Sequence, residues 1–453
     1  MTTATKKQGP SGEPGSKLRL PLPRFPLGGQ QPPGGPFRPG FWRSPLRGPW
    51  LTSVLSVGLL VGLPLVAVTG LVSYAAYNPS LGAANQLTPG RGLLGFYLFS
   101  WPTRPAWLYH LNQGIHVTLG IVLIPVVLAK LWSVIPKLFS WPPLRSLAQL
   151  LERVTLFLLV GGVLFEIVTG LLDIQYWYAF PFSFYAAHLY AGWVTIGAFL
   201  THTALKAPHL VKGLRSRSLR DELHRGLAET RPEEPEEDYE LVAASPGAPG
   251  LSRRGFLGLV AASSGLLTVV TVGQTAGAPV RRVLGALAPR GRLGGEGPND
   301  FPVNKTAAFY NITAAETGGA WRLEVVGPSG ARRLFDRAQL MALPQSTQVL
   351  PIACVEGWAT TQRWTGVPLS ALARMVGGDG ATMLVVESLQ RGGAFGSAIL
   401  SQEQLADPGS LLALCVNGAD LSPDHGFPAR MVIPAAPGVH NTKWVQRLSF
   451  ERT

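Results

Sequence analysis

Long apolar runs alternate with short polar segments through the first 280 residues of the chain. A helix needs about 20 residues to cross the hydrocarbon of a membrane. Five runs approach or exceed this length: Leu51–Ala76, Leu111–Ile135, Val154–Leu172, Phe184–Leu205 and, after a polar gap, Gly255–Gly277. Apolar runs of this length are unusual in soluble proteins. The pattern predicts an α-helical transmembrane bundle of four helices, followed by one anchor helix.

The pattern changes in the last third of the chain, where apolar positions alternate over short runs separated by Gly, Pro and Asp. The runs expected to form strands are Trp321–Val326, Thr382–Glu387 and Ala429–Pro434. Helical patterns lie between them at Asp336–Ala342 and Leu369–Met375. This mixture predicts a compact α+β domain.

Composition and charge fit this division. The 453 residues are 46% hydrophobic and only 14% charged, and the formal net charge is +13. The basic residues flank the helices, so the charge indicates a membrane topology and not nucleic-acid binding. Residues 1–49 hold eight Lys or Arg and a single acid, Glu13, whereas the predicted outward segments hold only Arg91 and Arg104. The N-terminus is therefore expected to be cytoplasmic and the α+β domain extracytoplasmic.

Six segments follow from these patterns. Residues 1–49 are rich in Pro, Gly and basic side chains and are expected to be a disordered cytoplasmic tail. The others are a four-helix membrane domain (50–206), a cytoplasmic linker that begins basic and ends acidic (207–251), an anchor (252–278), a second linker (279–298) and the α+β domain (299–453).

A specific motif opens the anchor. Ser252-Arg253-Arg254-Gly255-Phe256-Leu257 precedes an apolar run of small residues and resembles a twin-arginine export signal. That route carries folded proteins, so the motif predicts a cofactor in the domain that follows. The alternative is an ordinary arginine pair beside a membrane helix.

Three stretches of the α+β domain carry a resemblance to a known family. They are Phe301-Pro-Val-Asn304, then Cys354-Val-Glu-Gly-Trp358 with Arg363-Trp-Thr-Gly-Val-Pro-Leu369, then Asn417-Gly418 leading to Asp424-His-Gly-Phe-Pro-Ala-Arg430-Met-Val-Ile-Pro434 and Lys443-Trp444. In this order they resemble the molybdopterin-binding domain of the sulfite oxidase family. The resemblance implies an α+β oxidoreductase domain that holds a molybdenum–molybdopterin cofactor.

By this resemblance Cys354 is the thiolate that binds molybdenum. A metal that changes oxidation state favours a soft, strongly donating anion, and cysteine loses its proton when it binds a metal. The resemblance also implies cofactor contacts from Arg430 and Lys443. Further hydrogen-bonding contacts are expected from Asn304, His440, Asn441 and Thr442.

The substrate pocket is expected close to the metal ligand, with Glu356, Trp358 and Arg363 in its wall. Animal and plant sulfite oxidases place an arginine a few residues after the ligand cysteine, whereas the next cation here is Arg363. The Cys-Val-Glu-x-Trp pattern resembles instead the bacterial periplasmic branch, whose best-known members reduce methionine sulfoxide in proteins.

Histidines in the predicted membrane helices are candidate haem ligands, because histidine is costly in hydrocarbon and usually functional there. His116 and His188 are each followed four residues later by a glycine, which leaves room for a flat porphyrin on the same helix face. We expect one b-type haem between them, with His202 as an alternative ligand. These pairs resemble those of membrane cytochrome b subunits; the alternative is a set of hydrogen bonds inside the bundle.

Together these features predict a molybdopterin-dependent oxidoreductase in the cell membrane of a bacterium. Its reaction would move an oxygen atom to or from a small sulfur or nitrogen compound, with electrons passing through the haem to or from quinone or a respiratory complex. A sulfite dehydrogenase is the alternative enzyme. A metal-free binding or assembly module of a respiratory complex is the alternative of another class, against which the intact Cys354, Arg430 and Lys443 argue.

Overall fold

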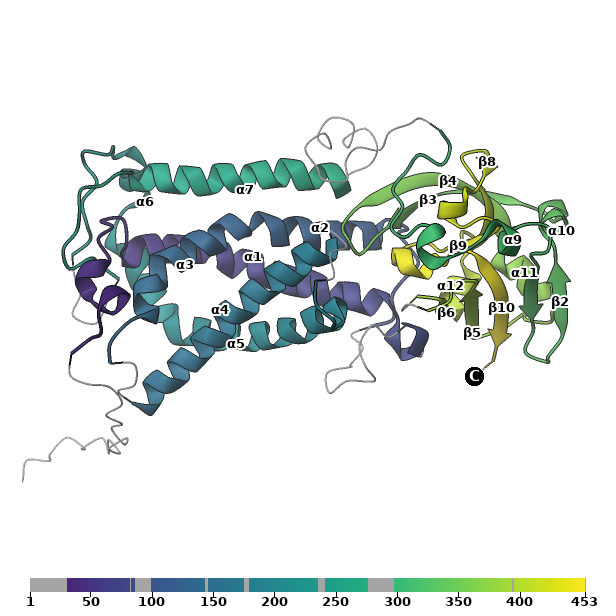
Figure 1. The fold of residues 1–453 in the computed structure, drawn as a ribbon, viewed down its shortest axis with the longest axis horizontal. Helices are drawn as coiled ribbons and strands as arrows, with labels where there is room; N and C mark the ends of the chain where they lie inside the picture. The colour runs from purple at the N-terminus through teal and green to yellow at the C-terminus, as the bar shows by residue number, and fades with distance from the viewer. Residues whose placement is uncertain are drawn as a thin grey trace, which may run out of the picture.

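The computed structural model describes residues 31–81, 83–85, 99–142, 146–174, 179–234, 241–275, 297–392 and 395–452. A helical bundle and a sheet domain lie end to end (Figure 1). Residues 1–30 of the predicted tail and 276–296, most of the second linker, are outside the described residues.

The bundle contains six long helices and one short helix among the described residues. Their bounds are α1 Pro49–Ala76, α2 Leu108–Val122, α3 Ile124–Leu138, α4 Leu147–Ile174, α5 Phe184–Ser216, α6 Leu219–His224 and α7 Arg253–Thr275. The predicted second span is two helices, because Pro125 has no N–H to continue the helical hydrogen bonds across Leu123. α7 packs along α2 and α3 (Figure 1).

Four spans within the described residues are long and apolar enough to cross a membrane: Pro49–Ala76, Leu108–Leu138, Gln149–Ile174 and Arg253–Val272. The predicted fourth run, Phe184–Leu205, is helical in α5 but is not one of these four. α5 packs against both α1 and α4, so part of its surface faces protein.

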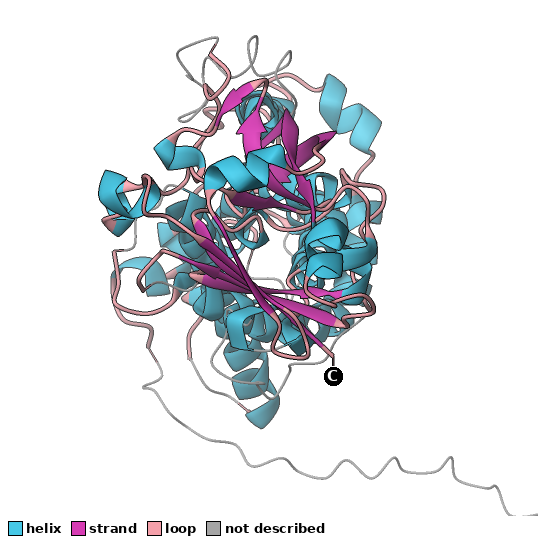
Figure 2. Cartoon of the chain, turned by 90° about the vertical axis from the view of Figure 1, so that its right-hand side faces the viewer, coloured by secondary structure: helices cyan, strands magenta, loops and turns pink. Residues whose placement is uncertain are grey.

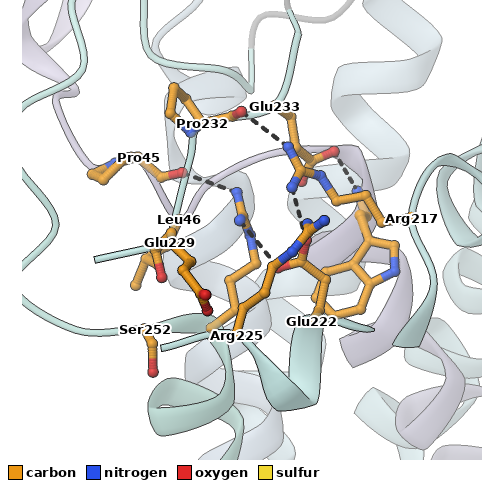
Figure 3. Close-up of polar contacts among 12 residues, drawn as sticks. Pro45, Leu46, Arg217, Glu222, Arg225, Glu229, Pro232, Glu233 and Ser252 are labelled. Carbon is orange, nitrogen blue, oxygen red and sulfur yellow. Dashed lines mark hydrogen bonds and ion pairs between the residues drawn. The ribbon is translucent and has the colours of Figure 1, made fainter. Parts of the chain in front are cut away.

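A buried ionic cluster closes the end of the bundle away from the sheet domain (Figure 3). Arg253, only 1% exposed, lies 3.3 Å from Glu222 and donates to the Pro45 carbonyl at 3.1 Å. Glu222 also pairs with Arg217 at 2.8 Å and with Arg225 at 2.5 Å. The cluster ties α5, α6 and α7 to the segment before α1.

Neither the tail nor the first linker is unstructured throughout. Residues 35–37 and 39–41 form short 3-10 helices, and the Arg47 guanidinium lies 4.3 Å from the Trp132 ring centroid. In the linker, Glu233 is buried and its carboxylate accepts from the Trp50 amide at 3.0 Å. The predicted disorder of residues 1–49 is therefore wrong for residues 35–48. Sequence patterns missed this order because the partners are distant in the chain.

The sheet domain contains two five-stranded sheets among its described residues. Figure 2 shows their strands in magenta. One has the order β2-β1-β10-β5-β6; the other has the order β3-β4-β7-β8, with β9 paired to β7. The strands are β1 Leu323–Val326, β2 Arg332–Phe335, β3 Ser346–Ala353, β4 Ala359–Pro368, β5 Met383–Ser388, β6 Ser397–Ser401, β7 Leu411–Val416, β8 Ala419–Asp420, β9 Arg430–Val432 and β10 Val445–Glu451.

Short helices precede and connect these strands. They are η6 Ala308–Tyr310, α9 Ala314–Thr317, α10 Arg337–Ala342, α11 Leu369–Met375, α12 Gln402–Ala406, η7 Pro423–His425 and η8 Gly438–His440. The helices α10 and α12 begin with capping boxes at Asp336 and Ser401. Fully buried side chains such as Leu323, Leu384 and Leu414 form the main core. The expected α+β class is confirmed.

Candidate functional site

Cys354 lies in a tight loop, residues 354–358, between β3 and β4. The last pair of the hairpin joins Ala353 to Ala359, and the Cys354 amide donates to the Trp358 carbonyl at 2.9 Å. Gly357 has φ +87°, a left-handed conformation that favours glycine. The loop buries the Cys354 thiol, which is 2% exposed.

Glu356 is the acidic group of this loop. Its Oε1 lies 3.3 Å from the Cys354 Sγ, and its Oε2 accepts from the Trp358 indole at 2.8 Å. Burial raises the pKa of Glu356 to about 9, against which the Trp358 hydrogen bond acts weakly. The carboxyl is therefore protonated at neutral pH and can hold a proton beside the thiol.

A second segment, residues 430–443, lies beside the loop. Ala353 and Pro437 form a parallel bridge, and a Cβ on Gly438 would lie 3.4 Å from the Cys354 Cα. The Met431 amide donates to the Thr442 carbonyl at 2.8 Å, which folds the segment back on β9. This arrangement brings the predicted cofactor-binding residues toward Cys354.

Several polar atoms of this segment are buried without a protein hydrogen bond: His440 Nδ1 and Nε2, Thr442 Oγ1 and Arg430 Nε. Such groups are costly unless a ligand or water satisfies them. Burial lowers the pKa of His440 to about 4 and that of Arg430 to about 9. We call Cys354, Arg430, His440 and Thr442 the Cys354 cluster. Its orphaned donors and soft thiol fit a polar, anionic metal cofactor.

The other predicted cofactor-binding residues hold the backbone in place. Lys443 donates to the Asp424 carbonyl at 2.9 Å and also to that of Lys305. Asn441 Oδ1 accepts from the Ile433 amide, and Asn304 Oδ1 accepts from the Lys305 amide. Burial and the neighbouring Arg430 lower the pKa of Lys443 to about 7.

Arg363 does not join the cluster. It lies on β4, paired with Val349 of β3, and its side chain is exposed while the adjacent Trp364 is fully buried. Successive strand residues point to opposite faces. Its predicted place in the pocket wall therefore has no support in the structure.

In the bundle, His116 of α2 and His188 of α5 face each other, with ring centroids 6.3 Å apart and ring planes at 84°. Both line an apolar cavity of about 420 Å³, together with Gly120 and Gly192. His202 does not line this cavity. The structure thus brings together two of the three predicted haem ligands.

A repeated four-residue sequence supports each histidine. Val-Thr-Gly-Leu occurs at residues 68–71 and again at 168–171. Thr69 Oγ1 lies 3.3 Å from His116 Nδ1, and Thr169 Oγ1 lies 2.9 Å from His188 Nδ1. Histidines that bind a metal usually have their other nitrogen held in this way. The repeat is the signal that could have identified these partners.

The adjacent glycines give the two rings room. A Cβ on Gly70 would lie 2.9 Å from His116 Cε1, and a Cβ on Gly170 would lie 3.5 Å from His188 Cε1. Glu166 lies 3.1 Å from His188 Nε2, so its carboxyl occupies the side of the ring where a metal would bind. The pair fits a flat, bis-histidine cofactor if the Glu166 side chain turns away.

Comparison with known proteins gives the following matches. Residues 311–453 match the model of the oxidoreductase molybdopterin binding domain. A subunit named for protein-methionine-sulfoxide reductase, YedZ1 of Azospira oryzae, is 33% identical over 153 residues, 33% of this chain and 55% of that protein. Oxidoreductase YuiH of Bacillus subtilis is 29% identical over 153 residues, 34% of this chain and 74% of that protein.

A plant protein matches over a shorter stretch of the chain. Inducible nitrate reductase (NADH) 1 of Glycine max is 38% identical over 100 residues, which are 20% of this chain and 11% of that protein. The chain thus spans about half of the length of YedZ1 and a small part of the nitrate reductase.

Proposed function

We propose that this chain, whose residues 311–453 match the oxidoreductase molybdopterin binding domain, is a molybdopterin oxidoreductase of the sulfite oxidase family. It would transfer an oxygen atom to or from a small sulfur or nitrogen compound at the outer face of the cell membrane. Electrons would reach quinone, or come from it, through one b-type haem between His116 and His188. The proposal rests on the Cys354 cluster, in which the loop with a buried thiol adjoins, at the Ala353–Pro437 bridge, a segment with orphaned polar atoms.

The molybdenum–pterin group, when bound, would supply two-electron oxygen-atom transfer, and the haem would supply single-electron exchange. Cys354 would hold the metal, while His440, Thr442 and Arg430 would hydrogen-bond the pterin. Glu356 would keep a proton next to the reacting centre, because its pKa is raised to about 9. Removing oxygen from a sulfoxide consumes two electrons and two protons and yields the sulfide and water.

A sulfoxide is the substrate that we favour. The name of YedZ1 refers to methionine sulfoxide. Arg363, the next cation after Cys354 in the sequence, is exposed on β4, so it does not supply the arginine that animal and plant sulfite oxidases place a few residues after the ligand cysteine. The orphaned atoms of the Cys354 cluster also argue against a metal-free binding module.

We further propose that the N-terminus is cytoplasmic and that Ser252-Arg253-Arg254 is an export signal for the sheet domain. One arginine of this signal is buried in the ionic cluster of the folded chain (Figure 3). Arg253 is buried against Glu222 in the folded chain. The export machinery would therefore have to bind the signal before this end of the bundle packs.

Metal analysis and a visible spectrum of the detergent-purified protein test the proposal. The wild-type chain is expected to contain about one molybdenum and a b-type haem band after reduction. Cys354→Ala should lose the molybdenum and keep the haem, and His116→Ala should do the reverse. A wild-type protein without molybdenum, from a host that makes the pterin, would refute the catalytic proposal.

A further inference from the structure

The Cys354 loop is hydrogen-bonded to the helical bundle. Gln113 of α2 donates from Nε2 to the Val355 carbonyl at 2.6 Å. Its Oε1 accepts from the Ser73 hydroxyl of α1 at 2.7 Å. Gln113 is 4% exposed, so water competes little for either bond. The two bonds fix the amide, and the amide in turn fixes the loop.

Close packing surrounds this contact. A Cβ on Gly357 would lie 2.7 Å from Val117 Cγ1, so the loop backbone lies directly against α2. Ala353 and Ala359, which flank the loop, pack in one buried cluster with Tyr109 and Trp101. The Tyr77 ring, at the end of α1, lies 5.6 Å from that of His440. The bundle therefore contacts both segments that carry the Cys354 cluster.

The Cys354 loop also lies close to the histidine pair. Val355, the residue after Cys354, lines the cavity that holds His116 and His188. His116 follows Gln113 by three residues, about 4.5 Å of helix rise, on the same helix face. The loop thus covers the end of the cavity nearest the sheet domain.

We infer that Gln113 is a positioning residue, which holds the Cys354 loop against α2 and so fixes the distance between the Cys354 cluster and the histidine pair. This inference rests on the proposed function, because a fixed distance matters if redox cofactors bind at both sites. Each electron that one cofactor loses would be gained by the other. A loop that lifted from α2 would slow that exchange without removing either cofactor.

The most informative variant is Gln113→Met, which keeps a side chain of similar size and removes both the donor to the Val355 carbonyl and the acceptor for the Ser73 hydroxyl. Arg104→Ala is the matched control, because it removes a 2.7 Å ion pair with Asp407 between the same two parts of the chain and leaves the loop untouched.

Two measurements on the full chain in detergent test the inference. The first is hydrogen exchange of the Cys354 and Gly357 amides, whose hydrogen bonds close the loop. Gln113→Met is expected to lower their protection about tenfold or more, the effect of losing one buried hydrogen bond. Arg104→Ala should leave it within about twofold of wild type.

The second measurement is the rate at which methionine sulfoxide oxidises the dithionite-reduced haem. Gln113→Met is expected to keep the haem and molybdenum contents and to slow this oxidation at least fivefold. Unchanged amide protection, or lost protection with an unchanged oxidation rate, would overturn the inference. If wild type itself shows no oxidation, the proposed function fails, while amide protection alone still decides whether Gln113 holds the loop.

Discussion

Gly357→Ala is expected to be the most damaging single methyl addition in the Cys354 loop. Two costs add. Alanine at φ +87° costs about 1 kcal/mol, and its Cβ would lie 2.7 Å and 2.8 Å from two atoms of Val117. Val117 is buried and β-branched, so it has little freedom to rotate away. Overpacking of this kind costs about 1–3 kcal/mol, which gives about 2–4 kcal/mol in all.

Thermal unfolding of the detergent-purified chain, followed by tryptophan fluorescence, measures this cost. For a domain of the size of the sheet domain, a destabilisation of 2–4 kcal/mol lowers Tm by about 5–15 °C. Gly330→Ala is the strain-only control, because Gly330 has φ +83° and an added Cβ would meet nothing within 4 Å. Combining Gly357→Ala with Val117→Ala removes the Cγ1 contact at 2.7 Å but keeps the Cβ contact at 2.8 Å, so the double variant should recover part of the steric share of about 1–3 kcal/mol. Equal costs at Gly357 and Gly330, or no recovery in the double variant, would refute the docking of the loop on α2.

Three further predictions follow from other parts of the structure. Glu222→Gln should destabilise the chain by about 3–5 kcal/mol in thermal unfolding, because three arginines lose their buried partner. The control Glu234→Gln, at an exposed position, should change little, and equal effects of the two variants would contradict a stabilising role of the ionic cluster. Burial and Arg430 lower the pKa of His425 to about 4, so neutral His425 adds fully to the free energy of unfolding above pH about 6.5, and this share falls by about 1.4 kcal/mol per pH unit down to pH about 4. A pH series in which the free energy of unfolding of His425→Gln has the wild-type slope would contradict this. Gly70→Ala should lower haem content more than Gly170→Ala, since its Cβ would lie 2.9 Å rather than 3.5 Å from the histidine ring; equal haem in both would argue against ligation by His116 and His188.

The sequence predicted the fold class because the signals for it are local. Apolar length indicated the membrane helices, and alternation with turn residues indicated the sheet domain. Leu369–Met375 was predicted as a helix and is α11. The break at Pro125 was also readable from the sequence, as was the outward face of Arg363, because Trp364 follows it in a strand.

What the sequence could not give is contact between distant segments. The motif around Cys354 indicated a metal ligand. The hydrogen bond that holds this loop, from Gln113 to the Val355 carbonyl, joins residues 242 positions apart. Glu222 and Glu233 read as part of a solvated linker, yet both are buried against residues of other segments. The supporting threonines of the histidines required recognition of the repeated Val-Thr-Gly-Leu, whose two copies lie on α1 and α4.

The proposed function requires an oxygen-transfer site at Cys354 and a haem at His116 and His188 to work as one unit. To test this, the haem of the purified protein is reduced anaerobically, methionine sulfoxide is added and the b-type band is followed. We expect the band to be oxidised in wild type and to stay reduced in Cys354→Ala with its haem intact. A wild-type band that stays reduced, in protein containing both molybdenum and haem, would contradict methionine sulfoxide reduction coupled through these two sites.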